Sequence, residues 1–143
     1  METQVILDTD VVVDHLKRKP EPTATQIFHE IRTGRLVAYM TSITIFELYR
    51  GAKLAPKPKE KVGHIEAILG YVSCLPLDET AANVASDMCV FLERKGELIE
   101  IRDLFIGAIT KKAGLPLVTK NIAHFKRVPD IEVITPNDLM GTL

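Results

Sequence analysis

Short runs of apolar residues alternate along this chain with longer segments whose apolar residues recur at helical spacing. The short runs cover residues 5–7, 36–40, 71–75, 117–119 and 131–134, and we predict that they are strands. Strands with a continuous apolar sequence are typical of parallel sheets that helices cover on both faces. The pattern therefore predicts an α/β fold, a three-layer α/β/α domain with a mostly parallel central sheet.

The segments between these runs carry the start and stop signals of helices. Ser42 and Asp78 are predicted N-caps, and Gly114 follows a segment at the position typical of a helix end. After Asp78 the apolar residues gather on one helical face, and we expect Met88 and Phe91 in the core. The predicted helices span residues 11–19, about 23–33, 42–52, about 59–70, 79–95 and 101–113.

Size and charge limit what the chain can be. Its 143 residues are expected to form one domain, 1–143, with a core that needs no disulfide or structural metal. Lys and Arg number 18 against 19 Asp and Glu, so nucleic-acid affinity must come from local patches or a bound metal. With no basic leader and no apolar run of roughly 20 residues, we expect a cytoplasmic protein without membrane contact.

Cys74 and Cys89 lack metal-ligand spacing and are expected to be buried apolar side chains.

Polar residues follow three of the predicted strands. Asp8 ends the first strand, the pair Thr41 and Ser42 follows the second, and 119–121 (Thr-Lys-Asn) follows the fourth. Functional groups of open parallel sheets lie at the carboxyl ends of the strands, so these three segments are expected at one edge.

Three acids stand out, and each has a purely structural explanation. Asp8 could cap a helix, Glu47 could pair with Arg50 at i,i+3, and Asp103 could complement a helix dipole. A single cluster around a divalent cation explains all three together, because Mg²⁺ prefers oxygen ligands and keeps waters for phosphate contacts. Such a site hydrolyses a phosphodiester by activating a water and neutralising the charge on the phosphate. Two more acids follow Asp8, namely Asp10 and Asp14, and their mutual repulsion also favours a cation.

The chain resembles PIN domains, and more narrowly the VapC toxins of toxin-antitoxin modules, over nearly its whole length. Four segments in a characteristic order and spacing carry the resemblance: 5–10 (VILDTD), 41–52 (TSITIFELYRGA), 103–108 (DLFIGA) and 117–121 (LVTKN) with His124 and Phe125 beyond.

The resemblance implies a site in which Asp8, Glu47 and Asp103 bind Mg²⁺ or Mn²⁺. Asn121 and His124 lie where the family often has a fourth acid, and because Asn offers only a neutral carbonyl oxygen, one-metal and two-metal sites both stay open. The residues expected to support the ligands are Thr9, Asp10, Ser42 and Thr119.

The resemblance also implies an endoribonuclease that attacks structured RNA of the transfer RNA or ribosomal RNA class. It implies a homodimer that is silenced by a cognate antitoxin inserting an apolar segment. Arg50 and Lys120 are the main candidates for RNA contacts, although charged clusters more often mark solvated surfaces. Further candidates are Lys17, Arg18, Lys19, Lys53, Lys126 and Arg127.

Two other interpretations stay open at this point. In a haloacid-dehalogenase-like phosphatase, Asp8 would be the nucleophile, Asp10 the acid/base and Thr119 the phosphate ligand. That interpretation leaves the Glu47 helix without a role, and the chain is short for that fold. In the second alternative the chain is a degenerate PIN domain that only binds RNA or protein, with Asn121 as the first lost ligand.

Overall fold

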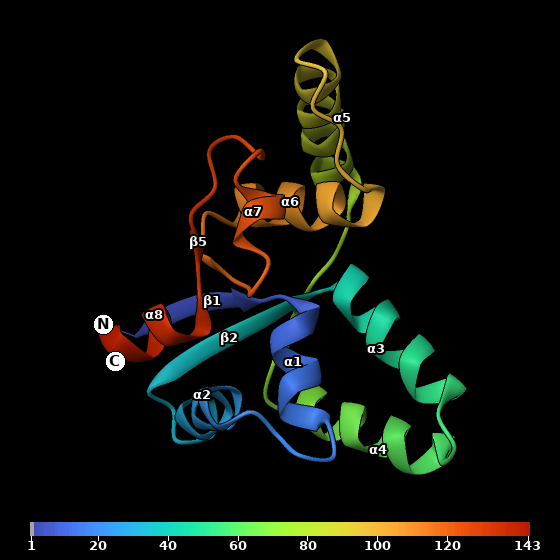
Figure 1. The fold of residues 1–143 in the computed structure, drawn as a ribbon, viewed down its shortest axis with the longest axis vertical. Helices are drawn as coiled ribbons and strands as arrows, with labels where there is room; N and C mark the ends of the chain where they lie inside the picture. Colours follow the sequence, from blue (N-terminus) through green and yellow to red (C-terminus); the bar gives the residue numbers. More distant parts are fainter. Residues whose placement is uncertain (1) are drawn as a thin grey trace.

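A parallel sheet forms the centre of the protein (Figure 1). The computed structural model describes residues 2–143, and within them five strands lie in the order β3-β2-β1-β4-β5 with every neighbouring pair parallel. The strand bounds are β1 Thr3–Leu7, β2 Leu36–Thr41, β3 Ser73–Leu75, β4 Leu117–Val118 and β5 Val133–Ile134. The predicted parallel sheet is therefore confirmed, and β1 lies at its centre.

Helices follow the strands in the alternation that the sequence predicts. In the described part of the chain they are α1 Thr9–Leu16, α2 Pro22–Arg32, α3 Ser42–Leu54, α4 Pro58–Leu69, α5 Glu79–Arg94, α6 Ile101–Ala113, α7 Ile122–Phe125 and α8 Pro136–Thr142. The sequence analysis missed the short helices α7 and α8. For α8 a signal exists, because Thr135 and Asp138 form a capping box and Pro136 occupies the first turn.

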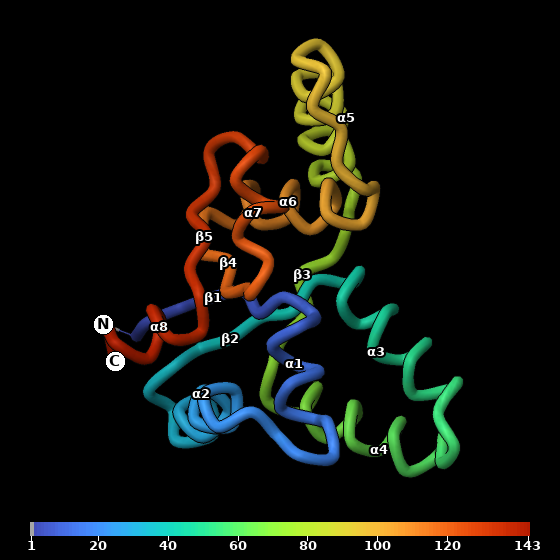
Figure 2. The backbone as a smooth tube through the Cα atoms, viewed as in Figure 1, coloured from blue at the N-terminus to red at the C-terminus, as the bar shows by residue number. Residues whose placement is uncertain are grey.

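Two apolar cores lie on opposite faces of the sheet, which confirms the three-layer architecture. Val5 and Leu7 of β1 point into one core, which α1, α2, α3, α4 and α8 cover. Ile6 points into the other, which α5, α6 and α7 cover. The alternation of side chains along a strand produces this division, because successive residues face opposite sides. The tube in Figure 2 shows the two helical layers on either side of β1 and β2.

Two expectations about the core are wrong. Met88 is buried, but Phe91 is 43% exposed, because α5 extends beyond the sheet and packs mainly on α6 (Figure 1). Cys74 is exposed, because its strand β3 forms an edge of the sheet, and Cys89 is half-buried. Both thiols are free.

Close packing fixes α6 against the segment that follows α7. A Cβ atom on Gly107 of α6 would lie 3.0 Å from the Cγ1 atom of Val128, so this glycine permits the Val128 side chain to pack against the backbone of α6. The first turn of α6 and the residues of α7 are thereby held at the same edge of the sheet as the ends of β1 and β2. In the described residues, no helix is long and apolar enough to cross a membrane.

Candidate metal-binding site

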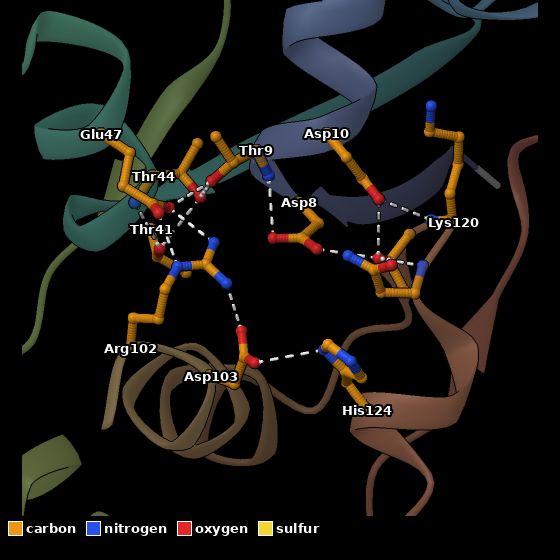
Figure 3. Close-up of polar contacts among 12 residues, drawn as sticks. Asp8, Thr9, Asp10, Thr41, Thr44, Glu47, Arg102, Asp103, Lys120 and His124 are labelled. Carbon is orange, nitrogen blue, oxygen red and sulfur yellow. Dashed lines mark hydrogen bonds and ion pairs between the residues drawn. The ribbon is translucent and has the colours of Figure 1, made fainter. Parts of the chain in front are cut away.

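Acidic side chains from three elements converge at the carboxyl edge of the sheet (Figure 3). Asp8 follows β1, Glu47 lies in α3, and Asp103 lies in the first turn of α6. The side chains of Asp8 and Asp103 are almost completely buried, with residue exposures of 2% and 3%. Buried carboxylates are costly unless hydrogen bonds or cations compensate their charge, so the partners of each acid define the site.

Asp8 is held by two hydrogen bonds from different parts of the chain. Its Oδ1 accepts from the backbone N of Thr9 at 2.8 Å, which makes it the N-cap of α1, and its Oδ2 accepts from the hydroxyl of Thr119 at 2.7 Å. Burial, and secondly the charge of Asp10, raises the pKa of Asp8 to about 6. The capping role considered from the sequence is thus real, and the same carboxylate also faces the site.

Asp10 ties α1 to the segment that follows β4. Its Oδ2 accepts from the backbone N of Lys120 at 2.9 Å and from the hydroxyl of Thr119 at 3.3 Å. Its Oδ1 is buried and has no hydrogen-bond partner among the described residues. Burial raises the pKa of this carboxyl group as well. The supporting role expected for Asp10 and Thr119 fits these contacts, and one buried oxygen remains available to a cation or water.

Glu47 forms an ion pair with a residue that the sequence analysis did not consider. The Arg102 Nε donates to Glu47 Oε2 at 2.5 Å and the Arg102 Nη2 donates to Oε1 at 2.7 Å. The hydroxyl of Thr9 donates to the same Oε1 at 2.6 Å. The pairing of Glu47 with Arg50 is therefore wrong for this structure, because a bidentate guanidinium from another helix satisfies both carboxylate oxygens.

Asp103 shares the same guanidinium. The Arg102 Nη1 donates to Asp103 Oδ1, and the other carboxylate oxygen lies 3.5 Å from His124 Nδ1. Burial raises the pKa of Asp103, while the charges of Arg102 and His124 oppose this change. A sequence signal for Arg102 exists, because a cation in the first turn of a helix is unfavourable to the helix dipole and needs a compensating partner.

Several predicted site residues have other contacts. Thr41 is the N-cap of α3, because its hydroxyl accepts a hydrogen bond from the backbone N of Thr44. The prediction of Ser42 as the N-cap is therefore wrong, and the Ser42 hydroxyl accepts from the backbone N of Leu77 instead. The backbone N of Asn121 donates to the hydroxyl of Thr119 at 3.0 Å. The Lys120 ammonium lies 2.7 Å from Asp14 Oδ2, and this bond raises the pKa of the lysine.

The donor set fits a hard divalent cation. Asp8, Glu47 and Asp103 offer carboxylate oxygens, the ligand type that Mg²⁺ and Mn²⁺ prefer. Within residues 2–143, however, no three acidic, His or Cys side chains are already close enough to hold a metal ion. Arg102 lies between two of the three acids in Figure 3, which accounts for their separation.

Comparisons with known proteins agree with this architecture. Residues 5–131 match the family model of the PIN domain, so the chain belongs to the PIN domain family. A ribonuclease VapC2 from Haemophilus influenzae is 30% identical over 123 residues, which cover 86% of this chain and 90% of that protein. A tRNA(fMet)-specific endonuclease VapC from Salmonella typhimurium is 29% identical, with 90% of this chain and 94% of that protein covered.

A solved structure shows the same fold. The crystal structure of DNA-bound VapBC from Salmonella typhimurium superposes with a TM-score of 0.82 and 26% identity, covering 94% of this chain and 98% of the matched chain. The family resemblance stated from the sequence is thus confirmed, and the phosphatase interpretation loses its basis because it requires a different fold.

The raised pKa of Asp8 predicts an unusual dependence of stability on pH. The folded protein holds a proton on Asp8 more tightly than the unfolded chain does, because the pKa is about 6 in the folded state and 3.8 in the unfolded state. The protonated carboxyl group therefore favours the fold fully below pH 3.8, and this contribution is lost as the pH rises through about 6. In EDTA, the free energy of unfolding of the wild type should therefore fall between about pH 4 and pH 6 relative to Asp8→Asn. The rise in pKa corresponds to a difference on the order of 3 kcal/mol at neutral pH. Urea unfolding at a series of pH values measures it.

Asp78 provides a matched control. It also caps a helix, α5, but it is exposed, and a hydrogen bond from Lys112 lowers its pKa. Its stabilising contribution is present above its unfolded pKa and disappears as the pH falls, so Asp78→Asn should lower the stability at neutral pH. If Asp8→Asn were destabilising at pH 7 in the same way, burial of the Asp8 charge would not be costly and the interpretation of the site would be wrong.

Proposed function

We propose that this protein is a divalent-metal-dependent endoribonuclease and the toxin of a toxin-antitoxin pair. The observation that carries the proposal is the convergence of Asp8, Glu47 and Asp103, from β1, α3 and α6, at the carboxyl edge of a PIN domain. Relatives named as ribonucleases and endonucleases that match most of this chain support it.

Asp8, Glu47 and Asp103 are the proposed ligands of Mg²⁺ or Mn²⁺. When bound, the cation activates a water for attack and neutralises charge on the scissile phosphate. Two short hydrogen bonds orient these ligands, because the hydroxyl of Thr119 donates to Asp8 and that of Thr9 donates to Glu47. The imidazole of His124 faces Asp103 at 3.5 Å. Because Asn121 presents a neutral amide where a fourth acid could stand, we propose that one tightly held cation is sufficient.

Structured RNA of the transfer RNA class is the proposed substrate. One relative is named for its specificity for tRNA(fMet). We propose that this chain binds a similar structured RNA in the cytoplasm. His124 and Arg127 line a hollow that also contains Asp103, so they are placed to contact the RNA backbone beside the proposed ligands. A second hollow is lined by Lys17, Arg18, Lys19 and Glu21. Because Lys17 pairs with Asp14 and Glu21, Arg18 and Lys19 offer the further positive charge there. Arg50 lies in a separate hollow with Lys53, and Lys120 is held by Asp14, so neither is a primary contact in this proposal.

Cleavage of RNA by the purified chain tests the proposal. Asp8→Asn and Asp103→Asn should each lower the cleavage rate at least about a hundredfold, because each removes a charged ligand while the hydrogen-bonding shape of the side chain is kept. The wild type should cut total RNA with Mg²⁺ or Mn²⁺ and not with EDTA, and gel analysis of the fragments measures the rate.

Asp87→Asn is a suitable control, because Asp87 is an exposed acid of α5 outside the site. Full activity of Asp8→Asn would contradict the ligand assignment. RNA binding without any cleavage in either metal would favour the degenerate, binding-only interpretation.

An apolar groove between α1, α3 and α4 is the proposed binding site of the antitoxin. Its walls include Val13, Leu16, Leu48, Ala52 and Ile65, and Val13 is 46% exposed. Solved neighbours of this fold are VapBC complexes, so we propose that an apolar helix of the cognate antitoxin occupies this groove and that the active form is a homodimer.

A charge in the groove should release the toxin from its antitoxin. Val13→Glu places a carboxylate in the apolar contact, and we expect antitoxin affinity to fall at least about tenfold while RNA cleavage is retained. Val90→Glu, at a valine of α5 that is similarly exposed at 44%, serves as the control. Isothermal titration with the co-encoded antitoxin measures both variants, and equal affinities would place the antitoxin elsewhere.

A further inference from the structure

We propose that Arg102 is a built-in cation that competes with the divalent metal for the same carboxylates and thereby sets the metal affinity of the site. This inference rests on the proposed metal site of Asp8, Glu47 and Asp103. It concerns a residue that the proposed nuclease mechanism does not use, although its guanidinium lies at the centre of the acidic cluster (Figure 3).

The contacts of Arg102 are those that a metal ion would need. The guanidinium binds both oxygens of Glu47 and one oxygen of Asp103, so it engages two of the three proposed ligands at once. A divalent cation that bridges the same two carboxylates would have to lie in the space between them that the guanidinium fills, and the two positive charges would repel each other. Metal binding to both acids therefore requires Arg102 to leave.

Arg102 also supplies the charge that keeps the acids together without a metal. Of the other basic side chains, the Lys120 ammonium pairs with Asp14, and His124 contacts only Asp103, with 3.5 Å between its Nδ1 and Oδ2. A guanidinium keeps its proton under all ordinary conditions, so Arg102 stays charged and can be removed only by movement. Glu47 and Asp103 therefore have a cation between them in either state, the arginine or the metal.

The position of Arg102 permits this movement. Its side chain is 32% exposed, and it belongs to the first turn of α6, where rotation about side-chain bonds carries the guanidinium into solvent without disturbing the helix. Asp103, the next residue, is buried and stays in place. The departure of the guanidinium therefore needs no change of backbone.

Metal affinity in the absence of RNA tests the inference directly. We would titrate the wild type and Arg102→Gln with Mn²⁺ and follow free Mn²⁺ by electron paramagnetic resonance. Without its competitor the site should bind Mn²⁺ about tenfold more tightly, which corresponds to about 1.4 kcal/mol. Asp8→Asn should lose this binding, which assigns the signal to the site.

Arg35→Gln is a closely matched control. Arg35 also contacts both carboxylate oxygens of one glutamate, with Nη2 donating to Glu30 Oε1 at 2.8 Å and Nε 2.7 Å from Oε2. It precedes β2 and therefore lies at the opposite end of the sheet. Its loss should leave Mn²⁺ affinity unchanged. Unchanged or weaker binding in Arg102→Gln would overturn the inference, since the arginine would then be neutral or would help to arrange the ligands. Absence of Mn²⁺ binding in both proteins would instead remove the proposed metal site itself.

A second measurement uses the wild type alone and does not depend on the folding of a variant. The Nε–H of Arg102 donates to Glu47 and should give a protected side-chain resonance in nitrogen-15 spectra. Saturating Mg²⁺ should shift this resonance to the position of solvent-exposed arginines and speed its exchange with water. A resonance that is unchanged at saturating Mg²⁺ would show that the guanidinium does not leave, and the inference would be wrong.

Discussion

The cost of burying negative charge at the carboxyl edge of the sheet governs the rest of this structure. Asp8 and Asp103 are nearly inaccessible to water, and burial raises the pKa of each. Such groups persist only where cations or hydrogen bonds compensate them. The chain supplies both, with the hydroxyls of Thr9 and Thr119 and the guanidinium of Arg102. These groups offset the cost of keeping the acids together, and the acids can still bind a divalent cation that displaces the arginine.

The fold explains why these groups meet. Parallel strands all end at one edge, so residues distant in sequence, such as Asp8 and Thr119, become neighbours. The first turn of α6 lies at the same edge, and Gly107 of this helix allows the Val128 side chain to pack closely against it. A single small residue in α6 therefore contributes to the position of Asp103 without touching the site.

Much of this arrangement follows from the sequence, and the failures have physical causes. The acids Asp8, Glu47 and Asp103 were identified because strand ends and family motifs mark them. Arg102 was not, because the partner of a long, flexible side chain depends on tertiary packing, and local spacing favoured Arg50 for Glu47. Phe91 was placed in the core by helical periodicity, which cannot reveal that α5 extends beyond the sheet. The capping box of α8 was present in the sequence and was overlooked.

Anomalous diffraction from crystals of the wild-type protein soaked in Mn²⁺ tests the central claim most directly. The account predicts a manganese peak bounded by the carboxylates of Asp8, Glu47 and Asp103, with the Arg102 side chain turned away from Glu47. A peak elsewhere, or no peak at this edge of the sheet while the Arg102 ion pairs stay intact, would contradict it.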